Sequence, residues 1–217
     1  MKKFSYDTKK YKFKEIIQDH FKVKDLSLLH IDRNDLHPNL QLVFDNESKT
    51  EYHQWFYSKM NAGWNDLENA YHSFVKNEVG SIMDEEFIYQ YMPSFRVHLP
   101  NDKAIHKWHY DSDPDHIHPN WEINFQIALT DMYGTQATWV EPVPGLKNYA
   151  PMEMTYGEFF VFNGNKCTHG NKENISGKTR VSFDFRILPK KRYNPQSTES
   201  ITAKKKFLLG EYYRETK

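Results

Sequence analysis

One stretch near the end of the chain reads Arg180-Val181-Ser182-Phe183-Asp184-Phe185-Arg186-Ile187, and polar and apolar side chains alternate strictly along it. Successive side chains of a β-strand point to opposite faces, so this pattern predicts a strand with one apolar face and one polar face. The polar face carries two arginines. Such a face needs an interior cavity, a ligand or water opposite it.

Other short runs have the same strand character, and Gly, Pro, Asn and Asp separate them. They are residues 87–91, 95–99, 123–129, 138–140 and 158–162. Many short strands predict a sandwich or barrel. We therefore expect a mainly β core over residues 86–189.

The regions on either side of this core have a different pattern. Residues 1–85 read mainly as helix, because apolar residues recur at steps of three and four between Glu51 and Val79, with Gly63 as a point where the helix can break. Residues 12–22 form a shorter candidate helix. The tail, residues 190–217, is basic and weakly helical around residues 207–213. We expect a single domain overall.

Charge and composition exclude several classes of function. The 217 residues include 29 Lys+Arg and 29 Asp+Glu, so the formal charge is zero, and broad electrostatic capture of nucleic acid or an anionic membrane is not expected. No apolar run is long enough to span a membrane, and no apolar stretch follows the basic start as in a signal peptide. Cys167 is the single cysteine, which favours a reducing cytoplasm. The sequence does not indicate an oligomeric state.

A cluster of histidines contains the sharpest chemical signal. Five of the 11 histidines fall between His98 and His118, among them His109 of His109-Tyr110-Asp111. In an extended segment, residues two apart point the same way, so this imidazole and this carboxylate converge. A third ligand would complete the two-histidine, one-carboxylate site of non-haem Fe(II) oxygenases. His169 is the candidate, and Gly170 after it permits close backbone approach.

The arginines of the alternating strand suggest an anion site. Arg180 follows His169 by 11 residues, and Ser182 shares its face. A carboxylate suits the two-pronged donor geometry of a guanidinium, and the Ser182 hydroxyl can add a hydrogen bond. Arg186 lies on the same face, so either arginine can be the anchor.

These motifs together resemble the Fe(II)/2-oxoglutarate-dependent dioxygenases, in particular the phytanoyl-CoA-hydroxylase-like branch. Within it, the sequence is most similar to a small bacterial group typified by a streptomycin-biosynthesis protein. The resemblance covers about residues 86–189. The motifs that carry it are Arg96-Val97-His98-Leu99-Pro100, Trp108-His109-Tyr110-Asp111, Ala128-Leu129-Thr130-Asp131, Gly157-Glu158, His169-Gly170-Asn171 and residues 180–186.

The resemblance implies a double-stranded β-helix, or jelly roll, flanked by the N-terminal helices. It implies Fe(II) held by His109, Asp111 and His169, with 2-oxoglutarate as co-substrate anchored by Arg180 and Ser182, and dioxygen as oxidant. The products are succinate, carbon dioxide and an oxidised small polar or carrier-borne metabolite. Because Asp111 is present, hydroxylation is favoured over halogenation, whose enzymes lack this carboxylate.

Further residues are candidates for contacts with 2-oxoglutarate or the substrate. Two strand faces and the loop of residues 112–121 supply them, since loops on a rigid scaffold commonly carry recognition. The loop histidines, like His106, are not expected to be metal ligands. The candidates are Asn124 and Gln126 for 2-oxoglutarate, and Arg96, His98, His116, His118 and Trp139 for the substrate.

Two other readings of the same residues stay open. The first is a non-redox cupin-like isomerase or lyase that uses another divalent metal, although cupin sites use more histidines and do not need Arg180. The second is a catalytically silent jelly-roll binding module. An intact set of metal ligands argues against this module, because ligands without a function are free to drift.

Overall fold

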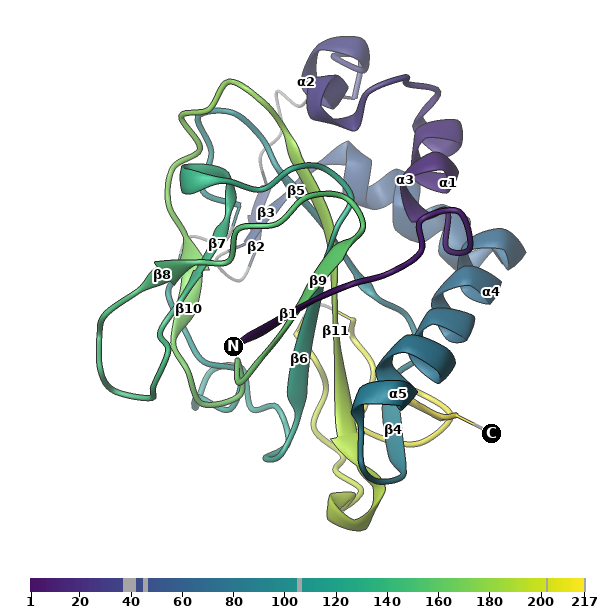
Figure 1. The fold of residues 1–217 in the computed structure, drawn as a ribbon, viewed down its shortest axis with the longest axis vertical. Coiled ribbons are helices and arrows are strands. Elements are labelled where there is room, and N and C mark those ends of the chain that lie inside the picture. Colours follow the sequence, from purple (N-terminus) through teal and green to yellow (C-terminus); the bar gives the residue numbers. More distant parts are fainter. Residues whose placement is uncertain (37–41, 45–46, 105–106, 202, 217) are drawn as a thin grey trace.

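The computed structural model describes residues 1–36, 42–44, 47–104, 107–201 and 203–216 (Figure 1). His106 therefore lies outside the described residues. The α-helices are α1 (Phe13–Phe21), α2 (Leu29–Asp32), α3 (Glu51–Asn61), α4 (Asn65–Phe74) and α5 (Gly80–Ile82), and a π-helical segment, Val75–Val79, joins the last two. Short 3-10 turns lie at Leu26–Leu28, Gly134–Gln136 and Lys190–Arg192.

The strands form antiparallel sheets. They are β1 (Lys2–Ser5), β2 (Leu42–Phe44), β3 (Glu47–Lys49), β4 (Phe87–Gln90), β5 (Ser94–His98), β6 (Ile123–Ala128), β7 (Thr138–Val140), β8 (Ala150–Pro151), β9 (Glu158–Phe162), β10 (His169–Asn171), β11 (Arg180–Pro189) and β12 (Tyr213–Glu215). The large sheet has the order β1-β9-β6-β11-β4-β12, and β5 also pairs with β11. The order β10-β7-β8 makes a small sheet, and β2 pairs with β3.

Strand β11 is the centre of the large sheet and contains the alternating stretch. It pairs with β6 along one side and with β5 and then β4 along the other. Its apolar face packs against the N-terminal helices: the Phe183 ring lies 5.8 Å from both the Phe13 ring of α1 and the Phe56 ring of α3. Figure 1 shows α1, α3 and α4 along this side of the sheet. The expected aromatic core is thus formed between helices and sheet.

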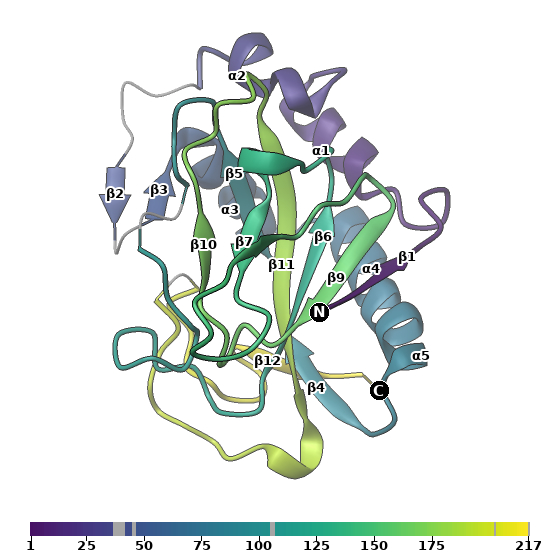
Figure 2. The same ribbon diagram turned by 60° about the vertical axis from the view of Figure 1, so that its left-hand side comes forward.

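The polar face of β11 is turned toward the small sheet, which lies in front of it in Figure 2. Side chains link the two sheets directly. Gln126 of β6 donates to the Thr138 hydroxyl of β7 at 3.0 Å, and Arg180 of β11 donates to the same hydroxyl at 2.9 Å. The polar faces of the two sheets therefore enclose a common interior, as the alternation predicts.

Most of the expected elements are present. The helix predicted over Glu51–Val79 is indeed broken, and Gly63 lies at the break with φ +93°, a left-handed conformation that glycine adopts without strain. Two terminal segments differ from the expectation. Residues 2–5 add strand β1 to the large sheet, and residues 207–213 form turns that lead into β12 rather than a helix.

Tertiary packing explains the difference at the C-terminus. Phe207, Tyr212 and Tyr213 are buried with Ile88 and Leu188 of the large sheet, in a small apolar cluster of their own. Burial of these large side chains overrides a weak local preference for helix. Within the part of the chain that the structure describes, every helix is too short or too polar to cross a bilayer.

Candidate metal centre and the cavity beside it

Backbone hydrogen bonds bring the predicted ligands together. The His109 amide donates to the His169 carbonyl at 3.1 Å, and the His169 amide donates to the His109 carbonyl at 2.8 Å. Two residues later, the Asp111 amide donates to the Gly164 carbonyl at 2.9 Å. The extended segment from His109 to Asp111 is therefore fixed against the loop after β9 and the start of β10.

The three side chains converge on one buried point. Asp111 Oδ1 lies 3.7 Å from His109 Nε2 and 3.6 Å from His169 Nε2, and one possible ligand atom from each residue lies within 4.8 Å of the others. The exposed fractions are only 7%, 1% and 6% for His109, Asp111 and His169. The spacing of the atoms suits a single metal ion bound on one face.

Hydrogen bonds also set the histidine tautomers. His109 Nδ1 lies 3.0 Å from the Lys107 carbonyl, and His169 Nδ1 lies 3.1 Å from the Cys167 carbonyl. A carbonyl can only accept, so each Nδ1 carries the proton and each Nε2 keeps its lone pair. This outer hydrogen bond is the usual way in which a metal-binding histidine is oriented.

Burial and nearby charges give His109, Asp111 and His169 the protonation states that metal binding requires. Burial, together with the neighbouring His169, lowers the pKa of His109 to about 3, and burial lowers the pKa of His169 too. Burial works against the Asp111 carboxylate, but the charges of Arg186, His118 and His169, together with the hydrogen bond from Arg186, outweigh it and hold the pKa of Asp111 well below its usual range. The site therefore offers two neutral nitrogens and one anionic oxygen.

Two hydrogen bonds occupy the second carboxylate oxygen of Asp111. Asp111 Oδ2 accepts from Asn124 Nδ2 at 2.6 Å and from Arg186 Nε at 2.8 Å, which leaves Oδ1 toward the histidines. Arg186 also donates to Asp184 at 3.2 Å. At Gly164 an added Cβ would lie 2.7 Å from the Asn124 amide, so only glycine lets Asn124 reach the carboxylate.

His109 and His169 border a small polar cavity of about 30 Å³, which is room for about one water molecule. A larger ligand therefore requires the lining side chains to move apart. The lining residues are Arg96, His109, Asn124, Gln126, Thr138, Phe162, His169, Arg180, Asp184 and Arg186.

Arg180 is the exceptional charge in this cavity. It is 1% exposed and donates only to neutral oxygens, at 2.9 Å to the Thr138 hydroxyl and at 3.4 Å to the Gln136 carbonyl. Among the described residues no carboxylate lies within 4 Å of it, and its Nε has no partner. Burial, and then the positive charge of Arg96, lower the pKa of Arg180 to about 10.

Other polar atoms near Arg180 also lack partners. The hydroxyl of Ser182, on the same face of β11, and the Gln126 Oε1 atom are both buried without a hydrogen bond among the described residues. Buried polar groups without partners are rare and costly in folded proteins. Together with Arg180 they mark this end of the cavity as a place for a polar ligand.

The candidate substrate residues are distributed unevenly. Arg96 lines the cavity and pairs with Asp184 at 2.6 Å. His98 lies deeper, opposite Arg180 across the β5–β11 pairing, with Nε2 2.7 Å from the Asp102 carbonyl. Burial and the charge of Arg180 lower the pKa of His98 to about 4.

The loop histidines and Trp139 are turned away from the cavity. The His116 ring stacks on His109 at 3.9 Å, and His118 Nδ1 lies 2.7 Å from Glu122. Trp139 lies on the outer side of β7, where Lys172 sits 3.3 Å above its ring. None of the three side chains lines the cavity.

Sequence reasoning missed a buried network behind Asp111. Glu122 accepts from His118 on one oxygen and from the Tyr213 hydroxyl on the other, and the Asp111, His118 and Glu122 side chains lie within 4.8 Å of one another. Both oxygens of Glu122 are thus already used. One signal for this network is the unit His118-Pro119-Asn120-Trp121-Glu122, which places histidine and acid four residues apart.

Comparisons with known proteins agree with this fold. No family model matches the sequence. The streptomycin biosynthesis protein StrG of Streptomyces griseus is 36% identical over 169 residues, which are 78% of either chain. In solved structures, the nickel complex of the non-heme monooxygenase ThoJ matches 91% of this chain and 77% of its own, with a TM-score of 0.55 and 10% identity. Its apo form matches the same shares, with a TM-score of 0.51 and 12% identity.

The likeness to ThoJ concerns the fold, since the identity is so low. The likeness to StrG is of another kind, because more than a third of the aligned residues are identical over most of both chains. The chain therefore belongs to the family of the streptomycin biosynthesis protein StrG.

Proposed function

We propose that the protein is an Fe(II)- and 2-oxoglutarate-dependent oxygenase with a double-stranded β-helix core, similar to the phytanoyl-CoA-hydroxylase-like enzymes. It hydroxylates a small polar or carrier-borne metabolite and releases succinate and carbon dioxide. One observation carries the proposal. One small cavity is lined by His109 and His169 of the His109–Asp111–His169 cluster and by Arg180, a buried cation that has no acidic partner among the described residues.

The donor set fits Fe(II). Two imidazole nitrogens and one carboxylate oxygen on one face are typical of the iron oxygenases, and they leave positions open for other ligands. Asn124 and Arg186 occupy the second oxygen of Asp111, so this carboxylate offers one oxygen rather than two. When bound, the iron supplies the activation of dioxygen that the side chains cannot provide.

The charges around the cavity fit a dicarboxylate. Asp111 and Asp184 balance Arg186 and Arg96 through ion pairs, and Arg180 is left with a positive charge. A carboxylate of 2-oxoglutarate supplies the missing partner, with the Ser182 hydroxyl as a further donor. Arg186 already holds Asp111, which favours Arg180 as the anchor.

Gln126 can join this anchor through a simple rotation. Its amide nitrogen now donates to the Thr138 hydroxyl, and Oε1 has no partner among the residues that the structure describes. If the amide is turned by 180°, the Thr138 hydroxyl donates to it instead, while still accepting from Arg180. The amide nitrogen of Gln126 then points to the ligand carboxylate.

Succinate formation tests the proposal. We expect the full chain to convert 2-oxoglutarate to succinate in air when Fe(II) and ascorbate are present, as measured by chromatography and mass spectrometry. Asp111→Asn should lose this activity, whereas Asp115→Asn, the same change at an exposed position of the adjacent loop, should keep it. A wild-type protein that binds Fe(II) but forms no succinate would favour the cupin-like enzyme or the binding module.

A further inference from the structure

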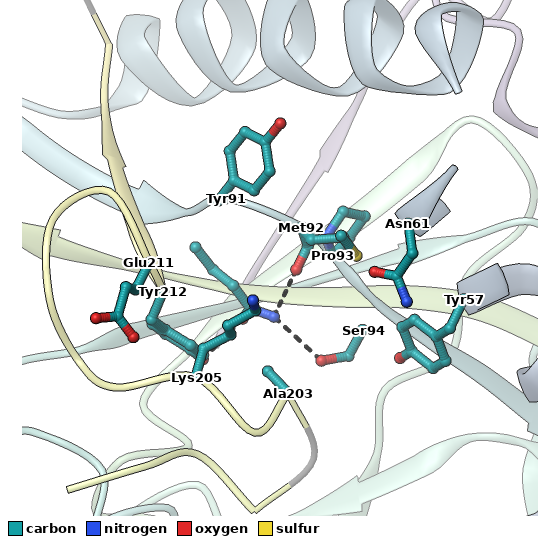
Figure 3. Close-up of a pocket in the computed structure, with 11 residues that line it drawn as sticks. Tyr57, Asn61, Tyr91, Met92, Pro93, Ser94, Ala203, Lys205, Glu211 and Tyr212 are labelled. Carbon is teal, nitrogen blue, oxygen red and sulfur yellow. Dashed lines mark hydrogen bonds between the residues drawn. The ribbon is translucent and has the colours of Figure 1, made fainter. Parts of the chain in front are cut away.

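A second and larger cavity lies at the edge of the large sheet, outside the metal centre. Its volume is about 280 Å³, close to the lower end of the range for small-molecule pockets. Figure 3 shows Tyr57 and Asn61 of α3 on one side and the tail residues Lys205 and Tyr212 on the other. The turn between β4 and β5 contributes Tyr91, Met92 and Pro93 to its lining. The cavity has room for one substituted ring.

The hydrogen bonds of the buried Gln90 amide determine which polar atoms of this cavity can still donate and which can still accept. Its amide lies 2.7 Å from the Met92 carbonyl, and a carbonyl only accepts, so the atom facing it is the nitrogen Nε2. The same nitrogen donates to the Ser94 hydroxyl at 3.2 Å, and Oε1 accepts from the Tyr212 hydroxyl at 3.0 Å. Gln90, Ser94 and Tyr212 are all at most 4% exposed, so this arrangement is rigid.

The fixed amide leaves one donor and one acceptor for a ligand. Ser94 accepts from Gln90, and its own hydroxyl hydrogen has no acceptor in the part of the chain that the structure describes. Tyr212 gives its hydrogen to Gln90, so the lone pairs of its oxygen are left. A neighbouring donor and acceptor match a hydroxyl group, which both accepts and donates.

The remaining lining defines the rest of the ligand. Tyr57, Tyr91, Met92 and Pro93 present apolar surface, which suits the face of a ring. Lys205 and Glu211 are the charged lining residues; they have opposite signs and both are exposed. No buried charge of this lining calls for a charged ligand. The lining therefore favours an uncharged ring that carries several hydroxyl groups.

Strand pairing connects this cavity to the metal centre. Ser94 lies opposite Asp184 in the β5–β11 register, so both side chains are on the interior face of the sheet. Asp184 accepts from Arg186, which in turn holds Asp111. The side chains of Asp184 and Arg186 thus lie between the larger cavity and Asp111, and both line the small cavity.

We infer that this larger cavity is a recognition subsite for the substrate of the proposed oxygenase, and that it takes an uncharged polyhydroxylated ring. The inference rests on the proposed function. The small cavity must already open to admit 2-oxoglutarate, whereas a ring in the larger cavity supplies binding energy away from the reacting carbon.

Ligand-observed saturation-transfer NMR tests the subsite on the full chain without added Fe(II), so no turnover takes place. The probes are methyl hexopyranosides and inositols, with the matching hexuronates and cyclohexanol as comparison compounds. We expect saturation of the neutral polyols above that of the other two classes. Succinate formation is measured separately. A protein that binds the polyols but forms no succinate would contradict the proposed function and not the polyol site.

Two variants locate the binding. Ala203→Trp fills the cavity from an exposed tail position and should abolish saturation of the polyols, while Ser197→Trp, on an exposed part of the same tail, should not. Ser94→Ala removes the free donor and should weaken polyol affinity roughly 5- to 10-fold, as expected for one hydrogen bond. Absence of polyol binding, equal binding of hexuronates or cyclohexanol, or unchanged binding in Ala203→Trp and Ser94→Ala would overturn the inference.

Discussion

Replacing Arg180 with methionine should raise the free energy of unfolding of the ligand-free protein and weaken its binding of 2-oxoglutarate. In the ligand-free protein, burial and then the charge of Arg96 lower the pKa of Arg180 to about 10, well below its ordinary value, which corresponds to about 3 kcal/mol of unfavourable charge burial. Methionine removes this cost. It also removes the hydrogen bonds to Thr138 and Gln136, which are worth about 1–2 kcal/mol together.

The ligand-free Arg180→Met protein should therefore be about 1–2 kcal/mol more stable than the wild type. For a chain of this length the melting temperature should rise by roughly 2–8 °C. Binding of 2-oxoglutarate should weaken by roughly 150- to 5,000-fold, because loss of one partner of a buried ion pair costs about 3–5 kcal/mol. Affinity for the metal should stay within a few-fold.

Calorimetric unfolding and anaerobic titration of metal-loaded protein with 2-oxoglutarate measure both effects. Arg186→Met serves as the matched variant, since it should weaken metal binding through Asp111 instead. A ligand-free Arg180→Met protein that is less stable than the wild type would make Arg180 a structural residue. Unchanged 2-oxoglutarate affinity in this variant, with loss in Arg186→Met at intact metal binding, would transfer the anchor to Arg186.

Three further results are expected. Asn124→Ala should weaken divalent metal binding roughly 10- to 100-fold in a metal titration, because Asp111 loses a hydrogen bond that orients it. A metal affinity equal to that of the wild type would show that metal binding does not need this hydrogen bond. Gly170→Ala places a Cβ 2.8 Å from the Trp108 ring and should destabilise the fold by about 1–3 kcal/mol in denaturant unfolding, with no change expected if the ring can move aside. The folded-state pKa of His98 is about 4, below its unfolded value, so its contribution is complete above pH 6.5 and is lost as the pH falls. Between pH 7 and pH 5 the free energy of unfolding should therefore fall by about 2 kcal/mol less in His98→Gln than in the wild type, and parallel pH profiles would contradict this.

The strands and the grouping of His109, Asp111 and His169 could be predicted because their signals are local or chemical. Period-two alternation located β11 and its neighbours, and the types and order of the residues singled out His109, Asp111 and His169. The terminal strands β1 and β12 could not be predicted in this way. Their partners lie far along the chain, so only long-range pairing makes them strands.

The surroundings of the site were harder to predict for the same reason. Alternation placed Arg180 and Arg186 on one face, but only the folded sheet shows that Arg186 binds Asp111 and that Arg180 has no acidic partner within the described part of the chain. The loop histidines were expected at the substrate. In the structure His116 stacks on His109 and His118 binds Glu122, contacts that depend on the path of the loop and not on the types of the residues.

The central claim is that one metal ion and one dicarboxylate share the cavity between the two sheets. A crystal structure of the anaerobic complex with Mn(II) and 2-oxoglutarate tests it most directly. We expect the metal about 2.0–2.3 Å from His109 Nε2, Asp111 Oδ1 and His169 Nε2, with the distal carboxylate on Arg180. A metal ion held by Asp111, His118 and Glu122, or a 2-oxoglutarate that does not reach Arg180, would contradict the account.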